Sequence, residues 1–185
     1  MLFHLSVSGV ERLPESGPAV LVSNHVSWLD PIVLPLVLPR KPAFLAMEEL
    51  WLMPGLRMVM RLYGPKAIPL RRGAIDTAAL KRALEILKNG ALLIVFPEGG
   101  ISHDGRLQPF HRGAALLAAR ADTPLIPVAI KGTAEALPLG QILPQAKPIT
   151  VSIGTPIRPH GTSREALRRA GEEAASQIQA LLSPP

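Results

Sequence analysis

The chain has 185 residues, a formal net charge of +6, 48% hydrophobic residues and no cysteine. This length fits one domain, and the lack of cysteine excludes disulfides, thiol nucleophiles and cysteine-ligated metal sites. Ten lysines and arginines lie between residues 40 and 88 against four acidic residues, whereas the rest of the chain is balanced. Such a basic segment indicates an anionic partner, which is phosphate groups, a lipid surface or nucleic acid, although a solvated surface with a chance bias would look the same.

The sequence lacks the marks of several functional classes. Aromatic residues make up only 4% of the chain, which argues against stacking on nucleic acid, so we expect no nucleic-acid partner. Nucleotide-binding glycine motifs and metal-ligand spacings are also missing, so we expect no metal. No apolar run approaches the ~18 residues of a membrane-spanning helix, and Met1–Val10 does not read as a signal peptide. If lipid is the substrate, we therefore expect peripheral contact, from the cytoplasmic side of the membrane.

Short apolar runs bounded by Gly, Pro or Asn predict buried strands. In chain order these runs are Ala19–Ser23, Ala43–Met47, Ala67–Leu70, Ala91–Phe96, Leu125–Ile130 and Ile149–Ile153.

Three helices are predicted among these strands. Apolar residues recur at helical spacing from Ile75 to Leu87, and Gly113–Arg120 is a shorter run rich in Ala and Leu. A last helix is predicted over about 163–182, where Thr162 and Glu165 have the spacing of a capping box. We therefore expect a single α/β domain over residues 1–185, with a mixed, mostly buried β-sheet flanked by helices.

The segment Met47–Leu62 interleaves bulky apolar residues with Arg57 and Arg61. Cations beside apolar groups suit a membrane interface or an acyl-chain-binding surface. An ordinary core helix interrupted at Pro54-Gly55 explains the same pattern.

A polar motif, Asn24-His25-Val26-Ser27-Trp28-Leu29-Asp30-Pro31, follows the first predicted strand. Histidine suits general base catalysis near neutral pH, and a carboxylate on its far ring nitrogen would fix the tautomer. His25 and Asp30 cannot meet on a straight helix, because a spacing of five residues places them about 140° apart. Pro31 disfavours helical backbone at Asp30, which predicts a turn that brings the pair together. A helix cap at Asp30 and a hydrogen-bonded loop histidine are the plainer interpretations.

Two further motifs follow later strands. Glu98 precedes Gly99 and Gly100, and this pair of glycines would let backbone approach a ligand closely. Arg71 and Arg72 end the short strand Ala67–Leu70, and arginine binds phosphate through a planar fork. A solvated turn and ordinary surface arginines are the alternatives.

Taken together, these motifs resemble the lysophospholipid acyltransferase family, also called the 1-acylglycerol-3-phosphate or glycerolipid acyltransferases. Its His-x4-Asp motif is matched at His25 and Asp30, its Arg-terminated acceptor block at Ile68–Arg71, and its Phe-Pro-Glu-Gly motif at Phe96–Gly99. The late Pro-containing block at Leu125–Val128 and the step into a helix at Phe110–Gly113 also match. The resemblance covers about residues 8–155.

The resemblance implies a glycerolipid-acyltransferase-like fold. It also implies transfer of a fatty acyl group from acyl-CoA or acyl-carrier protein, as cosubstrate and without a further cofactor, to the free hydroxyl of a lysophospholipid. His25 would be the general base and Asp30 its orienting partner. Arg71, Arg72, Glu98, Gly99 and Gly100 would hold the acceptor headgroup; Asn24 and Arg112 are secondary candidates.

The sequence departs from the family after Gly99, where Gly100-Ile101-Ser102 replaces the usual Thr-Arg-Ser. The second phosphate-binding arginine is therefore missing at position 101, and Arg72, Arg106 or Arg112 would have to compensate. A lysophosphatidylethanolamine-like acceptor becomes as plausible as a 1-acylglycerol-3-phosphate-like one. Two other functions stay open: a non-catalytic peripheral lipid- or phosphate-binding module, and an acyl-thioester hydrolase.

Overall fold

A computed structural model describes residues 4–47, 67–70 and 77–183. Within these residues the strands are β1 (His4–Ser8), β2 (Ala19–Ser23), β3 (Ala43–Met47), β4 (Ala67–Leu70), β5 (Leu92–Val95), β6 (Leu125–Lys131) and β7 (Pro148–Ile153). The helices are α1 (Asp30–Val37), α3 (Thr77–Lys88), α4 (Gly113–Arg120), α5 (Thr133–Ala136) and α6 (Arg164–Leu182), with a 3-10 turn at Val10–Arg12.

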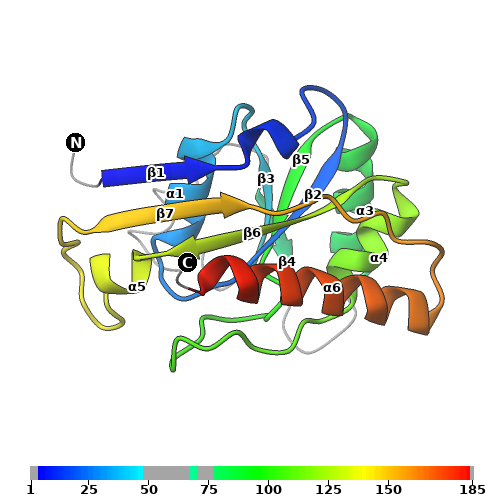
Figure 1. The fold of residues 1–185 in the computed structure, drawn as a ribbon. Helices are drawn as coiled ribbons and strands as arrows, with labels where there is room; N and C mark the ends of the chain where they lie inside the picture. Colours follow the sequence, from blue (N-terminus) through cyan, green and yellow to red (C-terminus); the bar gives the residue numbers. More distant parts are fainter. Residues whose placement is uncertain (1–3, 48–66, 71–76, 184–185) are drawn as a thin grey trace.

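The described strands form one seven-stranded sheet in the order β1-β7-β6-β2-β5-β3-β4 (Figure 1). Strands β6, β2, β5, β3 and β4 run parallel to one another, whereas β7 pairs antiparallel to β6 and parallel to β1. The mixed sheet confirms the predicted α/β fold class. The loops that follow β2 and β5 leave from the same edge of the sheet, as does the turn that follows β6.

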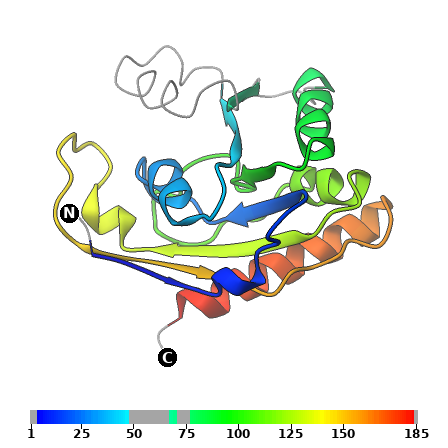
Figure 2. The ribbon, with the colours of Figure 1, turned by 90° about the horizontal axis from the view of Figure 1, so that it is seen from above.

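Helices cover both faces of the sheet (Figure 2). On one face, Val33 and Leu34 of α1 pack with Leu21 and Ile94 of the central strands. On the other face, helices α3, α4 and α6 pack on the alternate residues of the same strands, among them Val20. All of β2 is buried, because this strand lies between β6 and β5 under both layers of helices.

The predicted strands are confirmed, with shifts of one residue at the ends of β5, β6 and β7. Helix α4 begins and ends as predicted. The predicted capping box at Thr162 is wrong: Ser163 caps α6 by accepting a hydrogen bond from the Ala166 N–H at 3.1 Å. Glu165 is instead paired with Arg168, which lies one turn further along the helix surface.

Most of Met47–Leu62, the predicted membrane-interface segment, lies outside the described residues. Within the described parts of the chain, no helix is long and apolar enough to cross a membrane.

Gly132, directly after β6, offers a test of the β6–β7 packing. Its φ is +91°, and a Cβ at this position would overlap the carbonyl oxygen of Pro148. Gly140 has a similar φ of +86° but open space around it. We expect Gly132→Ala to lower the free energy of unfolding by about 1–3 kcal/mol more than Gly140→Ala, since only the first adds overpacking to backbone strain. Urea denaturation of both variants measures this difference, and equal losses would contradict the clash.

Candidate active site

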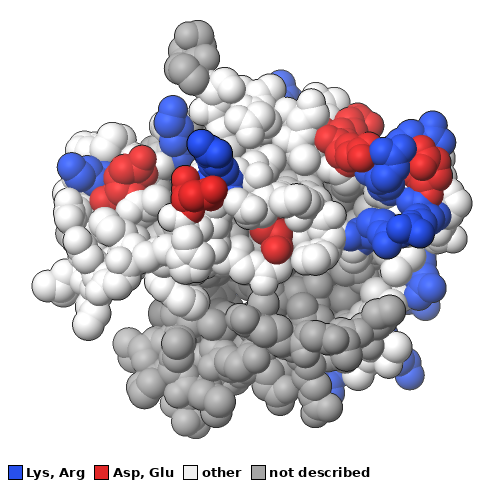
Figure 3. Space-filling view, turned by 90° about the horizontal axis from the view of Figure 1, so that it is seen from below, with Lys and Arg blue, Asp and Glu red and all other residues white. Residues whose placement is uncertain are grey.

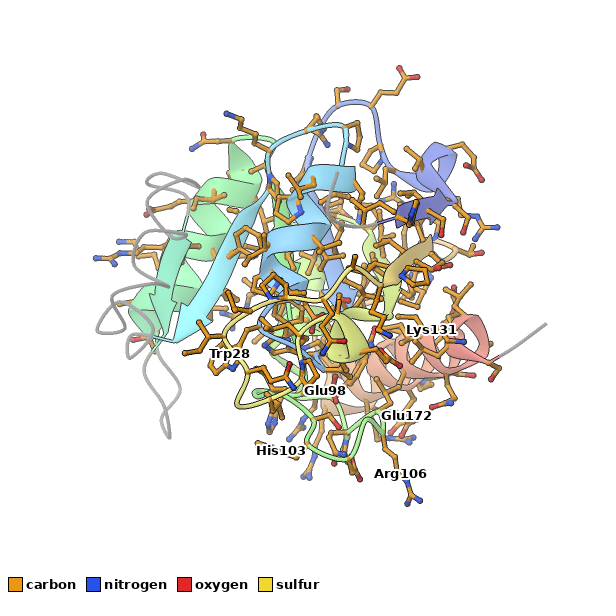
Figure 4. The ribbon with its side chains drawn as sticks, turned by 90° about the vertical axis from the view of Figure 1, so that its left-hand side faces the viewer. Trp28, Glu98, His103, Arg106, Lys131 and Glu172 are labelled. Carbon is orange, nitrogen blue, oxygen red and sulfur yellow. The ribbon has the colours of Figure 1, made fainter. Side chains whose placement is uncertain are left out.

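The candidate site lies where the chain leaves the central strands of the sheet. The motif that starts at Asn24 follows β2, and Phe96-Pro97-Glu98 follows the neighbouring strand β5. In parallel α/β sheets, sites form at the carboxyl ends of strands, where the connecting loops meet. Figure 4 looks onto this edge, with Trp28, Glu98 and Lys131 labelled.

His25 and Asp30 meet as predicted. The Nδ1 atom of His25 lies 2.8 Å from Oδ2 of Asp30. The side chain of Asp30 is 0% exposed, whereas that of His25 is 13% exposed. A carboxylate can only accept hydrogen bonds, so Nδ1 carries a proton, and in the neutral ring Nε2 then keeps its lone pair. The ring is thus in the tautomer that a general base at Nε2 requires.

The same carboxylate oxygen closes the turn between the two residues. Oδ2 of Asp30 also accepts hydrogen bonds from the backbone N–H groups of Val26, at 2.7 Å, and Ser27, at 2.9 Å. The predicted turn is therefore confirmed. The alternative of a helix cap at Asp30 is wrong, because α1 begins at Asp30 itself and Leu29 occupies the cap position.

The loop after β5 holds the backbone of His25 on both sides. The N–H of His25 donates to Oε1 of Glu98 at 2.7 Å, and its carbonyl accepts from the N–H of Ser102 at 2.8 Å. The ring of Phe96 stacks on the imidazole, with centroids 4.1 Å apart and planes inclined by 20°. Main chain and ring of His25 are both fixed by residues about 70 positions later in the sequence.

Glu98 is a half-buried carboxylate with backbone partners on both oxygens. Besides the His25 N–H, Oε2 accepts the N–H of Gln108 at 2.8 Å. Burial raises the pKa of Glu98 above its ordinary value of 4.5, and the hydrogen bonds from Gln108 and His25 oppose that rise. These contacts give Glu98 a positioning role for the loop and for His25; its predicted contact with an acceptor stays a prediction.

Asn24 joins the motif to the strand on its other side. Its side-chain amide donates to the carbonyl of Ile130 at 2.9 Å and accepts from the N–H of Ile130 at 2.8 Å. Only 2% of Asn24 is exposed. The side chain thus continues the β2–β6 ladder for one more residue, and it orients His25 through the main chain.

Gly99 and Gly100 lie beside His25's loop on the exposed surface. Gly99 has a φ of +78°, and a Cβ there would lie 3.2 Å from Cδ2 of the His111 ring. Gly100 has nothing within 4 Å of its would-be Cβ. Close approach of a ligand to Gly100 is therefore sterically open.

Ser102-His103-Asp104 does not form a nucleophile and base pair. The Oγ atom of Ser102 lies 2.9 Å from Oδ1 of Asp104 and 2.7 Å from the carbonyl oxygen of Arg106. These contacts close a local turn, which also holds the N–H of Arg106 on Asp104. The serine hydroxyl is engaged within its own loop.

Arg112 lies immediately before α4, at the rim of a groove of about 370 Å³. Described residues that line this groove come from 109–112 and from α6, among them Phe110, Arg164 and Arg168. Arg168 is already paired with Glu165 and Glu172. Figure 3 shows basic and acidic side chains intermixed at one end of this face, so much of the charge there is locally compensated.

Arg71 and Arg72 lie outside the described residues. The strand before them, β4, ends at Leu70 and runs parallel to β3. Among the described residues, no cluster of three or more His, Asp or Glu has the geometry to hold a metal ion.

Comparison with known proteins identifies the family of this chain. A family profile described as "Acyltransferase" matches residues 4–131. The chain belongs to the acyltransferase family. It is 37% identical over 143 residues to a chloroplast 1-acyl-sn-glycerol-3-phosphate acyltransferase of Brassica napus, which aligns with 75% of this chain and 40% of the relative.

Two further similarities extend over nearly the full chain. A chloroplast 1-acyl-sn-glycerol-3-phosphate acyltransferase of Arabidopsis thaliana is 36% identical over 183 residues, covering 95% of this chain and 48% of the relative. The crystal structure of the 1-acyl-sn-glycerophosphate acyltransferase PlsC from Thermotoga maritima superposes with a TM-score of 0.78 at 30% identity, covering 98% of this chain and 73% of that one. The chain thus spans less than half the length of these two plant relatives.

Sequence reasoning missed three contributions to the site of this family member. Phe96 was identified only as part of a motif, whereas its ring stacks on His25. The Ser102 N–H binds the His25 carbonyl, and the Ser27 hydroxyl donates to the carbonyl of Leu137 at 3.0 Å. The available signal for Phe96 was its position directly after a predicted strand, since His25 also follows a strand. Backbone donors leave no signal in a sequence.

Replacing Glu98 by glutamine tests its positioning role. A glutamine side chain can accept only one of the two backbone N–H groups and turns its own NH₂ toward the other. We expect Glu98→Gln to lower the free energy of unfolding by about 1–3 kcal/mol, the usual cost of an unsatisfied buried donor, and to reduce activity through a displaced His25. Chemical denaturation and activity assays measure both effects, with the exposed Glu173→Gln as the control.

The raised pKa of Glu98 also predicts the pH dependence of this effect. Because burial disfavours the ionised form, the stability from this group is fully present below its ordinary pKa of 4.5 and diminishes as pH rises through the raised value. We therefore expect the stability difference between the wild type and Glu98→Gln to narrow as pH rises from 4 toward 7. A stability difference that widens between pH 4 and pH 7 would contradict the raised pKa of Glu98.

Proposed function

We propose that this protein transfers a fatty acyl group from a thioester donor to the free hydroxyl of a lysophospholipid of the 1-acylglycerol-3-phosphate type. The observation that carries the proposal is the pair formed by His25 and Asp30, with Nδ1 and Oδ2 2.8 Å apart. The activity after which the similar plant proteins and PlsC are named supports the substrate class. A non-catalytic binding module would have no need of a fixed histidine tautomer.

The geometry supports a direct transfer. Nε2 of His25 takes the proton of the acceptor hydroxyl while the hydroxyl oxygen attacks the thioester carbonyl carbon. The tetrahedral intermediate then collapses, the carbon–sulfur bond breaks, and the leaving thiolate takes the proton back from the imidazolium. Asp30 stabilises the imidazolium through Nδ1 during this exchange. No protein nucleophile is required, in keeping with a chain that has no cysteine.

The donor is acyl-CoA or acyl-carrier protein, and the acceptor headgroup contacts Arg71, Arg72 and the exposed backbone at Gly99 and Gly100. We propose that the protein acts as a peripheral enzyme on the cytoplasmic side of a membrane. Arg112 is the further candidate for the phosphate, since it lies at the end of the same loop.

Removal of the proposed base is the first test. General base catalysis contributes about 10²–10⁴-fold, so His25→Ala is expected to lose activity by that factor while the fold is retained. Transfer from long-chain acyl-CoA and from acyl-carrier protein would be measured against a panel of lysophospholipids, with the exposed His160→Ala as the matched control. A His25→Ala variant as active as the wild type would refute the mechanism. Thioester cleavage without transfer to any acceptor would favour the hydrolase instead.

Headgroup recognition predicts a selective effect of the arginines. Hydrogen bonds to charged groups contribute about 1.5–3 kcal/mol, so loss of a phosphate contact should raise KM roughly ten- to hundredfold. We expect Arg71→Ala and Arg72→Ala to raise KM for a phosphate-headed acceptor and to leave KM for a neutral acceptor nearly unchanged. Arg120→Ala, at the end of α4, is the control. Equal effects on both acceptors in every variant would refute phosphate recognition by these residues.

A further inference from the structure

The loop between α5 and β7 exposes its apolar side chains. Ile142 is 91% exposed and Leu143 is 80% exposed, the highest values among the large hydrophobic residues of the described chain, and the nearby Leu139 is 38% exposed. Residues 136–146 contain no charged side chain. Single exposed leucines are common on soluble proteins, but adjacent ones in an uncharged loop mark an interaction surface.

Backbone hydrogen bonds hold this loop in shape. The N–H of Gln145 donates to the carbonyl of Ala136 at 2.7 Å, which brings the two ends of the loop together. Inside it, the N–H of Gln141 donates to the carbonyl of Pro138 at 3.0 Å, and Gly140 takes the left-handed conformation that the turn needs. Ile142 and Leu143 therefore stand at a preformed tip rather than on a segment that has failed to pack.

The loop is attached directly to the candidate active site. The Ser27 hydroxyl, within the turn that joins His25 to Asp30, donates to the carbonyl of Leu137 at the loop's first stem. Figures 1 and 2 both show the loop projecting at the end of the sheet where β6 finishes. The apolar tip and the catalytic turn thus share one edge of the molecule.

Charged residues flank the loop in the way that membrane-inserting segments require. Lys131 ends β6 and Lys147 precedes β7, and the antiparallel register pairs Lys131 with Thr150 near the base of the loop. Glu135 is the one acidic side chain between the two lysines. Cations beside an apolar tip are attracted to anionic headgroups while the tip enters the acyl boundary.

We propose that the loop of residues 137–147 inserts Ile142 and Leu143 into an anionic lipid bilayer and holds the His25–Asp30 edge against it. The choice of lipid as the partner rests on the proposed function, because a lysophospholipid acceptor resides in the membrane. Docking through this edge would present the acceptor hydroxyl to His25 without removing the lipid from its bilayer.

Site-specific labelling tests the insertion. The chain has no cysteine, so Leu143→Cys can be labelled with an environment-sensitive fluorophore at that position alone. With vesicles of phosphatidylcholine and phosphatidylglycerol, we expect a blue-shifted emission and quenching by lipids that carry a quencher in the acyl chain. Lys88→Cys, at the end of α3 before the opposite end of β5, is the control and should show neither. No shift at position 143, or equal shifts at both positions, would overturn the proposal.

A polar variant tests the contribution to binding and catalysis. Ile142→Ser combined with Leu143→Ser is expected to weaken vesicle binding on the order of tenfold or more, since two apolar side chains no longer leave water. Its thermal stability should match the wild type, because neither side chain is buried. Transfer to a vesicle-embedded acceptor should fall relative to transfer to a short-chain acceptor dispersed as monomers; an unchanged ratio would overturn the proposal.

Three outcomes separate this inference from the proposed function and from self-association. Insertion at position 143 without acyl transfer to any acceptor would refute the function and leave the docking surface in place. Acyl transfer by a protein whose position 143 stays in water would refute the docking surface and leave the proposed function in place. A dimer in lipid-free sedimentation that becomes a monomer in the double variant would assign the loop to a second copy of the chain and overturn lipid docking.

Discussion

Three N–H groups converge on a single carboxylate oxygen, Oδ2 of Asp30, and the candidate site depends on that convergence. The donors are the imidazole of His25 and the backbone of Val26 and Ser27. A buried carboxylate is costly unless hydrogen bonds compensate its lost hydration, so the turn must close around it. Since Asp30 is also the first residue of α1, whose Val33 and Leu34 lie in the core, the histidine ring is positioned by the packing of the sheet.

The main chain around His25 depends equally on the neighbours of β2. Asn24 binds the backbone of Ile130 on one side, and Glu98 binds the N–H of His25 on the other. These partners are 106 and 73 residues away in the sequence. A shift of one residue in the pairing of β6 with β2 would move the Ile130 backbone away from Asn24, and a shift of β5 would move Glu98 away from the His25 N–H. The register of the central strands therefore sets the position of His25.

The same edge brings chemically different surfaces together. The fixed His25 ring, an exposed pair of glycines and an uncharged apolar loop all lie at or beside the carboxyl end of β2, and Ser27 links the loop to the turn between His25 and Asp30. The proposed reaction between a lipid hydroxyl and a thioester would use this combination, because a lysophospholipid acceptor is amphipathic. The mixed charges along α6 lie on another face, where Arg168 is compensated by two glutamates.

Local sequence was sufficient for the buried strands and for α4, because burial acts within a few residues. The turn between His25 and Asp30 was predicted for the wrong reason: Pro31 lies inside α1 and Asp30 is the first residue of that helix, and the turn is closed by the hydrogen bonds that Asp30 accepts. Local sequence was insufficient for β1, a strand of only five mostly exposed residues, and for α1, whose Pro31 and Pro35 disguise a helix that the core stabilises. The cap of α6 also lay one residue from the predicted position, since Ser163 and Thr162 are equally suited as isolated residues.

The amino-acid sequence by itself determined which side chains are available for the chemistry and that His25 and Asp30 must be joined by a turn. Only the tertiary structure decided that Glu98 accepts the backbone N–H of His25, that Phe96 stacks on its ring, and that an apolar loop is attached to the same turn. The physical reason is that hydrogen bonds to backbone groups are independent of the partner's residue type. Such contacts exist only once distant strands have paired in a particular order and register.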